Sequence, residues 1–172
     1  MSMYPIASTT VGSGGVASVS FTSIPATFTH LQVRAFAQDA RASSYANSPI
    51  LVTFNGDTGA NYTWHSLTGN GSVGSSAGAT ALNFIYIQSA RTGSFGASIT
   101  DVLDYTNTNK NKVLRSMGGV DNNGSGIIEL DSGLWLNTSA ITSITLTPLS
   151  PNFSQYSSFQ LYGISTSNVT GA

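Results

Sequence analysis

Apolar and polar residues alternate in short runs along most of the chain. In residues 31–35, Leu, Val and Ala occupy one set of alternate positions, and Gln and Arg occupy the other. Because successive side chains of a strand point to opposite faces, this period of two is typical of a half-buried strand. No run of ten or more residues has the 3.6-residue apolar period of a helix. The predicted strands are 16–21, 31–35, 50–54, 82–88, 97–105, 112–117, 127–130, 141–147 and 159–164.

Turn-forming residues separate these segments. Asn-Gly pairs occur at 55–56, 70–71 and 123–124, and Ser-Pro-Asn occurs at 150–152. Short strands joined by frequent turns predict a sandwich or a barrel, and the long, uneven loops favour a sandwich. We therefore predict an all-β, antiparallel, jelly-roll-like β-sandwich of about eight to nine strands without significant helix. We expect an N-terminal arm or first strand in residues 1–15 and a single β-sandwich domain in residues 16–172.

The longest predicted loop, residues 55–81, is rich in Gly and Ser but also carries Tyr62, Trp64 and His65. Aromatic residues in a loop are usually anchored to something. Two interpretations stay open at this stage. Tyr62 and Trp64 fold the loop back onto the sandwich, or they contact a partner chain or a sugar.

Charged residues are scarce, which narrows the classes of partner. They make up 8% of the chain, against about 25% in typical soluble domains, and the formal net charge is −1. Nucleic-acid binding needs clustered Lys and Arg, so we exclude it. Lys110, Lys112 and Arg115 form the one basic cluster, which we expect on a single face, as solvated strand surface or as a partner contact. A surface of hydroxyls and amides is cheap to dehydrate, and therefore suits a protein that is covered by neighbours.

The chain has no cysteine, so it can form neither a disulfide nor a thiolate metal site. The first eleven residues lack the basic and apolar regions of a signal peptide, and no run of 18 apolar residues occurs. We therefore expect no export by that route and no membrane partner.

Signals for catalysis are weak. Residues 69–74 match G-x-G-x-x-G, but without the strand before and helix after that a dinucleotide site needs, so we expect a flexible loop. His30 and His65 are the two histidines, and each is expected to be a hydrogen-bonded structural residue. Asp101 and Asp104 point to opposite faces of their predicted strand, which prevents them from acting as a pair. We predict that the protein is not an enzyme and has no catalytic residue, cofactor or small-molecule ligand.

Residues 121–126 place oxygen-bearing side chains at positions 1, 3 and 5 and Gly at position 6, as at the start of a calcium-binding loop. Position 12 of that loop would be Ser132 in place of the bidentate Glu, and flanking helices are not predicted. The segment is therefore interpreted as a hairpin turn rich in Asp and Asn, with a weak cation site as the alternative.

Several stretches together resemble a family of small, all-β structural proteins of tailed-bacteriophage virions. These stretches are residues 21–31, 54–62, 132–148 and 158–164. The resemblance implies a capsid decoration or cement protein, made in the cytoplasm of the host bacterium and placed on the outer surface of the capsid. Its implied partners are the major capsid protein at capsomer junctions and other copies of itself, as a homotrimer. The family has no defined active site, so no catalytic residue is transferred.

For this function we expect contacts through the N-terminal segment and the 55–81 loop. The interface candidates are Met1, Tyr4, Pro5, Ile6, Tyr62, Trp64, His65 and Trp135. Trp135 lies within Leu-Trp-Leu beside a strand and is also predicted as core. The alternative is a carbohydrate-binding host-recognition module of a tail fibre or tail appendage, in which exposed Tyr62, Trp64 or Tyr105 stack on sugar rings. A polysaccharide-degrading enzyme is a third option, which needs a pair of carboxylates across a cleft.

Overall fold

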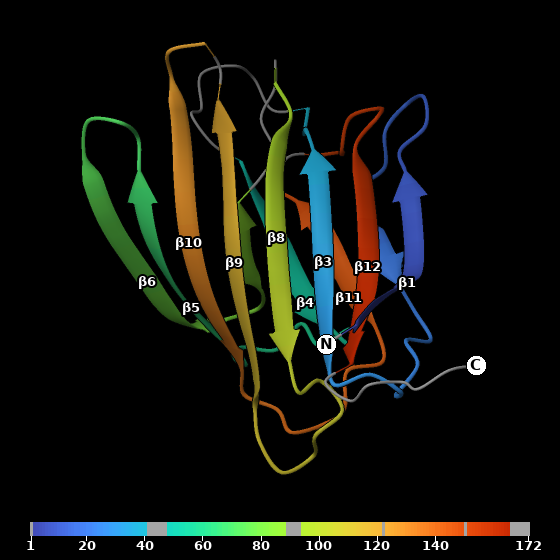
Figure 1. Ribbon diagram of the computed structural model, residues 1–172. Helices are drawn as coiled ribbons and strands as arrows, with labels where there is room; N and C mark the ends of the chain where they lie inside the picture. Colours follow the sequence, from blue (N-terminus) through green and yellow to red (C-terminus); the bar gives the residue numbers. More distant parts are fainter. Residues whose placement is uncertain (1, 41–47, 89–93, 122, 150, 166–172) are drawn as a thin grey trace.

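The computed structural model describes residues 2–40, 48–88, 94–121, 123–149 and 151–165. These residues form two antiparallel sheets of eight and four strands, and they contain no helix (Figure 1). The predicted all-β class is confirmed. The strands are β1 (Ser2–Thr10), β2 (Val19–Phe21), β3 (His30–Ala37), β4 (Pro49–Phe54), β5 (Tyr62–Gly69), β6 (Gly74–Leu82), β7 (Ile85–Gln88), β8 (Gly96–Leu103), β9 (Lys112–Asp121), β10 (Gly126–Trp135), β11 (Ile144–Pro148) and β12 (Ser158–Ser165).

The strand order is that of a jelly roll with two inserted hairpins. The larger sheet has the order β1-β12-β3-β8-β9-β10-β5-β6, and the smaller sheet has the order β2-β11-β4-β7. Without the β5–β6 and β9–β10 hairpins, the remaining strands pair in nested fashion: β1 with β12, β2 with β11, β3 with β8 and β4 with β7. Such a nested set of pairs, rolled into two facing four-stranded sheets, is a jelly roll.

Both inserted hairpins extend the larger sheet at the same edge, beyond β8. Figure 1 shows the β5–β6 hairpin projecting past the smaller sheet. At this side, β7 is the last strand of the smaller sheet, and it contacts β8, β9, β10 and β5. The half of the larger sheet beyond β8 is therefore covered from inside mainly by one strand.

The described strands number twelve, more than the predicted eight or nine. The additional strands are β1, β5 and β6. β6 has the sequence GSSAGATAL and is mostly exposed, so it lacks the apolar alternation that identifies a half-buried strand. The predicted loop over residues 55–81 is wrong for this reason: most of it is the β5–β6 hairpin, held by pairing to β10. Residues 2–10 form β1, which pairs with β12 at the sheet edge.

Three buried aromatic rings fill the core where β4, β5 and β10 meet. The ring centroids of Phe54, Tyr62 and Trp135 lie 5.7–6.4 Å apart. Trp135 Nε1 donates to Asp57 Oδ2 at 2.7 Å, and the Tyr62 hydroxyl donates to the Asp57 carbonyl at 3.0 Å. The hydrogen bonds from Trp135, Asn61 and the backbone of residue 59 lower the pKa of the Asp57 carboxyl. Tyr62 and Trp135 are therefore core residues, which corrects their choice as contact anchors.

Two glycines let β7 approach the larger sheet. A Cβ atom at Gly133 of β10 would lie 2.5 Å from Cγ2 of Ile85, and one at Gly118 of β9 would lie 2.9 Å from the carbonyl oxygen of Gln88. Contacts between carbon atoms normally begin near 3.5 Å, so any larger residue would push β7 away. The absence of these two side chains fixes the packing of β7 on the hairpin.

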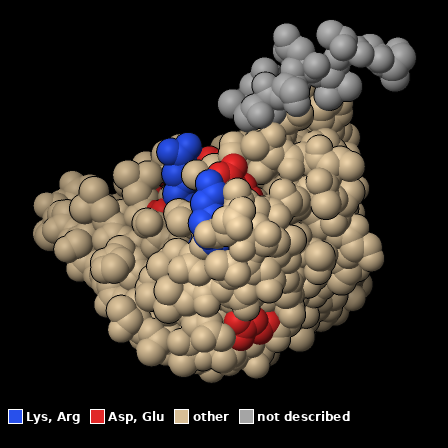
Figure 2. Space-filling view, turned by 90° about the horizontal axis from the view of Figure 1, so that it is seen from below, with Lys and Arg blue, Asp and Glu red and all other residues tan. Residues whose placement is uncertain are grey.

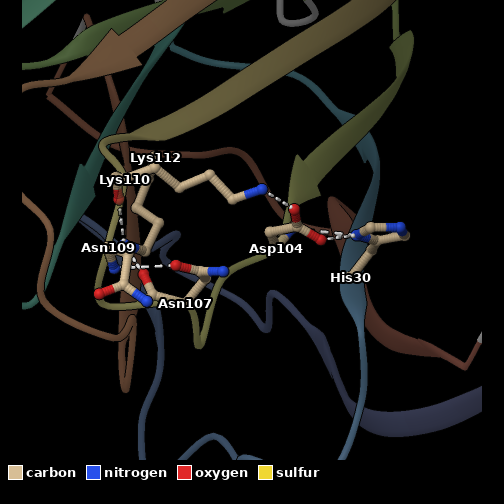
Figure 3. Close-up of polar contacts among 6 residues, drawn as sticks. All are labelled: His30, Asp104, Asn107, Asn109, Lys110 and Lys112. Carbon is tan, nitrogen blue, oxygen red and sulfur yellow. Dashed lines mark hydrogen bonds and ion pairs between the residues drawn. The ribbon is translucent and has the colours of Figure 1, made fainter.

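Lys112 is buried, which corrects the expectation that the basic cluster shares one face. The side chains of β9 alternate, so Lys112 points inward and Arg115 outward. Lys112 Nζ donates to the carbonyl oxygens of Asn107, Lys110 and Thr138 at 2.6–2.9 Å, while Lys110 extends to the Asp104 carboxylate (Figure 3). Burial is the main cause that lowers the pKa of Lys112. The ammonium thus ties two loops together and is not a surface charge.

We expect Asp57→Ala to lower the free energy of unfolding by about 1–3 kcal/mol, because it leaves the buried Trp135 N–H without an acceptor. The lowered pKa of Asp57 means that its contribution is complete above the pKa of an unfolded carboxyl, near pH 4, and is lost as the pH falls through the folded value. Urea denaturation near neutral pH and at about pH 3 measures both effects. Asp57→Asn, which keeps an acceptor oxygen, should lose less. An equal loss in both variants at both pH values would contradict this role.

We expect Lys112→Met to destabilise the fold by about 3 kcal/mol, since three carbonyl oxygens lose the donor that the buried ammonium gives them. Lys110→Met is the matched control. Its exposed ion pair with Asp104 should contribute less than about 1 kcal/mol. Thermal and urea unfolding of both variants test the difference. Equal losses of stability would show that the three hydrogen bonds of Lys112 stabilise the fold no more than the exposed ion pair of Lys110.

Candidate interaction surface

The outer face of the larger sheet carries a row of exposed apolar side chains across β8, β9, β10 and β5. Ile99 lies opposite Met117, Met117 opposite Leu130, and Leu130 opposite Leu67. Their exposed fractions are 42%, 53%, 50% and 57% in that order of strands. Neighbouring side chains on one sheet face contact one another, so the row is a continuous apolar surface.

A second apolar group lies beside this row. Phe36 is half exposed and stacks on Phe95 with ring centroids 5.0 Å apart, and Ile128 is exposed on the same face. Between the two groups lies an open groove of about 770 Å³, lined mainly by apolar atoms. Its lining includes Phe95, Ile99, Met117, Gly119 and Ile128. We call this groove and the row of four side chains the apolar face.

Directly behind this row, the inner face of the same strands carries buried polar side chains, which is the reverse of the usual arrangement. Towards the other end of these strands, the inner face carries core residues such as Tyr62, Leu114 and Trp135. A sheet face packed inside a protein is normally the more apolar one. On β10, Ile128 and Leu130 point outward while Glu129 and Asp131 are buried. The other buried polar residues on the inner face of this part of the sheet are Ser66, Ser98, Thr100 and Ser116. The apolar face therefore has the composition of a covered surface.

Charged side chains lie at one end of the outer face. Arg115 Nε lies 3.4 Å from Asp101 Oδ2, and Gln32 Nε2 donates to Asp101 Oδ1 at 2.9 Å. Figure 2 looks at the lower end of the molecule, where Lys and Arg side chains gather close to acidic ones and most of the visible surface carries no charge. The apolar face thus has a polar rim on one side, as protein interfaces commonly do.

Glu129 and Asp131 form a buried carboxyl pair that sequence reasoning missed. Trp64 Nε1 donates to Asp131 Oδ1 at 2.9 Å, and Thr68 Oγ1 donates to Glu129 Oε2 at 2.8 Å. Burial, followed by the adjacent Glu129 carboxylate, raises the pKa of Asp131 to about 8. Spacing of two in a strand places both on one face and could have identified the pair. However, alternation with Ile128 and Leu130 favours a solvated position for it.

Both histidines are accounted for structurally. His30 Nδ1 accepts a hydrogen bond from the backbone N–H of Asp104 at 2.9 Å. Figure 3 shows the imidazole beside the side-chain carboxyl of Asp104. His30 is thus a hydrogen-bonded structural residue, as predicted. His65 is exposed on β5, and its ring lies against Gly78 of β6, where a Cβ atom would be 2.5 Å from it.

The remaining interface candidates are divided between the two edges of the larger sheet. Tyr4 of β1 stacks on Phe28 at 5.8 Å, Pro5 is exposed, and Ile6 packs partly on the core. Trp64 is half-buried near the other edge, on β5, which lies next to the edge strand β6, and its ring packs against that of Tyr86. Met1 lies outside the described residues. The structure therefore does not gather these candidates into one site.

The G-x-G-x-x-G match and the segment that resembles the start of a calcium-binding loop both lie in hairpin turns. Residues 69–74 connect β5 to β6, and Asn70 Oδ1 accepts the backbone N–H groups of Ser72 and Val73 at 3.0 and 2.8 Å. Residues 121–126 connect β9 to β10, although Asn122 lies outside the described residues. In the described part of the chain, no three His, Cys, Asp or Glu side chains gather as a metal site, and no helix is long and apolar enough to cross a membrane.

Comparison with known proteins identifies no relative. No family model matches the chain, and neither the curated proteins nor the solved structures contain a significant match.

Proposed function

We propose that this protein is a structural component of a tailed-phage virion, a capsid decoration or cement protein on the outer surface of the head. It binds the major capsid protein at capsomer junctions through the apolar face, and its copies associate as homotrimers. The observation that carries the proposal is the reversed polarity of one part of β8, β9, β10 and β5. There Ile99, Met117, Leu130 and Leu67 point outward, and the side chains that point inward between them are polar.

Physical considerations favour a protein partner for this face. Contiguous exposed apolar surface on a soluble protein marks an interaction site, because leaving it in water costs free energy in proportion to its area. The near absence of charge lowers the cost of dehydrating the surroundings. The jelly roll is also a frequent architecture of viral capsid proteins, although it serves lectins equally. The expected partner surface is apolar at its centre and polar where it meets Asp101 and Arg115.

The sugar-binding alternative has less support. Sugar rings stack on exposed aromatic faces, but Tyr62 and Tyr105 are fully buried, and Trp64 is half-buried with its indole N–H bound to Asp131. An enzyme that cleaves polysaccharides would need its carboxylates in the groove. Glu129 and Asp131 instead point to the opposite side of the sheet.

Cosedimentation with capsids from which the protein has been stripped tests this function. We expect saturable binding of the wild-type chain at a fixed ratio to the major capsid protein, and about tenfold weaker binding by Leu130→Lys. Leu136→Lys is a matched control, since Leu136 is also 50% exposed but lies outside the apolar face. Both variants should unfold at temperatures close to the wild type.

Equal binding by the two variants would contradict the assignment of the apolar face. Retention of the protein on host glycans, without binding to capsids, would replace the capsid function by the host-recognition alternative.

A further inference from the structure

A buried polar cluster lies between the end of β7 and the inner face of β8, β9 and β10. Ser98 pairs with Gly118, and Gly118 pairs with Glu129, so the three form one row across the sheet. A Cβ atom at Gly118 would lie 3.0 Å from Cβ of Ser98 and 3.1 Å from Cβ of Gln88. The Gln88 side chain therefore starts directly over the gap that Gly118 leaves between Ser98 and Glu129. The Asp131 carboxyl also accepts a backbone hydrogen bond from Gln88.

Several polar atoms in this cluster have no hydrogen-bond partner. Gln88 is completely buried, and neither its Oε1 nor its Nε2 is bonded. Ser98 Oγ is buried and unbonded as well, and Asp131 Oδ2 has no donor, although its carboxyl lies within hydrogen-bond reach of the Glu129 carboxyl. A buried polar atom that stays unsatisfied destabilises the fold, and native proteins contain few of them. Together with the two carboxyls, these atoms form a buried polar cluster that a bound ligand would satisfy.

The donor set defines the chemistry of that ligand. The ion pairs of the described residues include neither Glu129 nor Asp131, so the two acidic groups have no cationic partner there. The oxygens available are carboxylate, amide and hydroxyl, with no nitrogen or sulfur ligand among the named groups. Hard cations prefer such oxygens, and Ca²⁺ accepts them in irregular geometry, whereas Mg²⁺ usually keeps several waters.

We propose that this cluster binds one calcium ion through Glu129, Asp131, Gln88 Oε1 and Ser98 Oγ. The ion neutralises the two carboxylates, and water completes its coordination and accepts from Gln88 Nε2. It connects β7 of the smaller sheet to β8 and β10 of the larger sheet. Calcium therefore stabilises the part of the sheet whose outer side is the apolar face. This inference does not depend on the identity of the partner of that face.

Terbium luminescence provides a direct test, because Tb³⁺ replaces Ca²⁺ and is excited by a nearby indole. The chain has two tryptophans, and Trp64 is bonded to the proposed ligand Asp131. With the full-length protein, we expect terbium emission on tryptophan excitation that excess CaCl₂ removes. Trp64→Phe should lose the emission but keep calcium binding by titration calorimetry. Asp57→Asn, which alters the carboxyl beside Trp135, should keep both.

Ligand variants complete the test. Gln88→Ala and Glu129→Gln should each weaken calcium binding by at least about tenfold. The wild type should melt at a higher temperature in CaCl₂ than in EDTA, and the variants should lose this difference. Circular dichroism identifies any variant that fails to fold. If Glu129→Gln does not fold, the calcium affinity of Gln88→Ala, which removes no charge, decides the test. An absence of calcium binding by the wild type, or binding that Gln88→Ala and Glu129→Gln leave unchanged, would overturn the proposal.

Discussion

The unequal width of the two sheets is the constraint on which the rest of the structure depends. Eight strands face four, so the hairpins β5–β6 and β9–β10 extend a sheet that has no full layer opposite them. The strand β7 is the main cover on the inner side of this extension, and it packs on Gly118 and Gly133. Behind the apolar face, the inner side of the extension holds buried hydroxyls and carboxyls, while Tyr62, Leu114 and Trp135 pack in the core at the other end of the same strands.

These two consequences fit together. Buried polar atoms of Gln88, Ser98 and Asp131 lack hydrogen-bond partners, and the proposed cation would supply charge and coordination to them and to Glu129. The apolar outer face, from Ile99 to Leu67, is the surface that we propose binds a partner, because binding would remove it from water. A jelly roll that fills its own interior would need neither. The extension is therefore the part of this protein where a ligand and a partner chain are both expected.

Alternation along the sequence predicted most strands and the two-sheet class, since a period of two survives in any half-buried strand. It missed β6, whose Gly, Ser and Ala positions carry no alternation, and β5, whose aromatics resembled loop anchors. Alternation also cannot tell which face is covered. Ile128 and Leu130 would be placed inside by that rule, but the register with β9 and the position of β7 turn Glu129 and Asp131 inward.

Oxidative footprinting of methionine tests most directly whether the apolar face is the contact surface. Met117 lies at the centre of the apolar face, and Met3 lies on β1 near the opposite sheet edge; both are exposed in the isolated chain. In capsid-bound protein, Met117 should be protected from hydroxyl radicals, while in the free chain it should oxidise readily. Unchanged oxidation of Met117 on assembly, with protection of Met3 instead, would contradict the apolar face as the interface and favour the β1 edge.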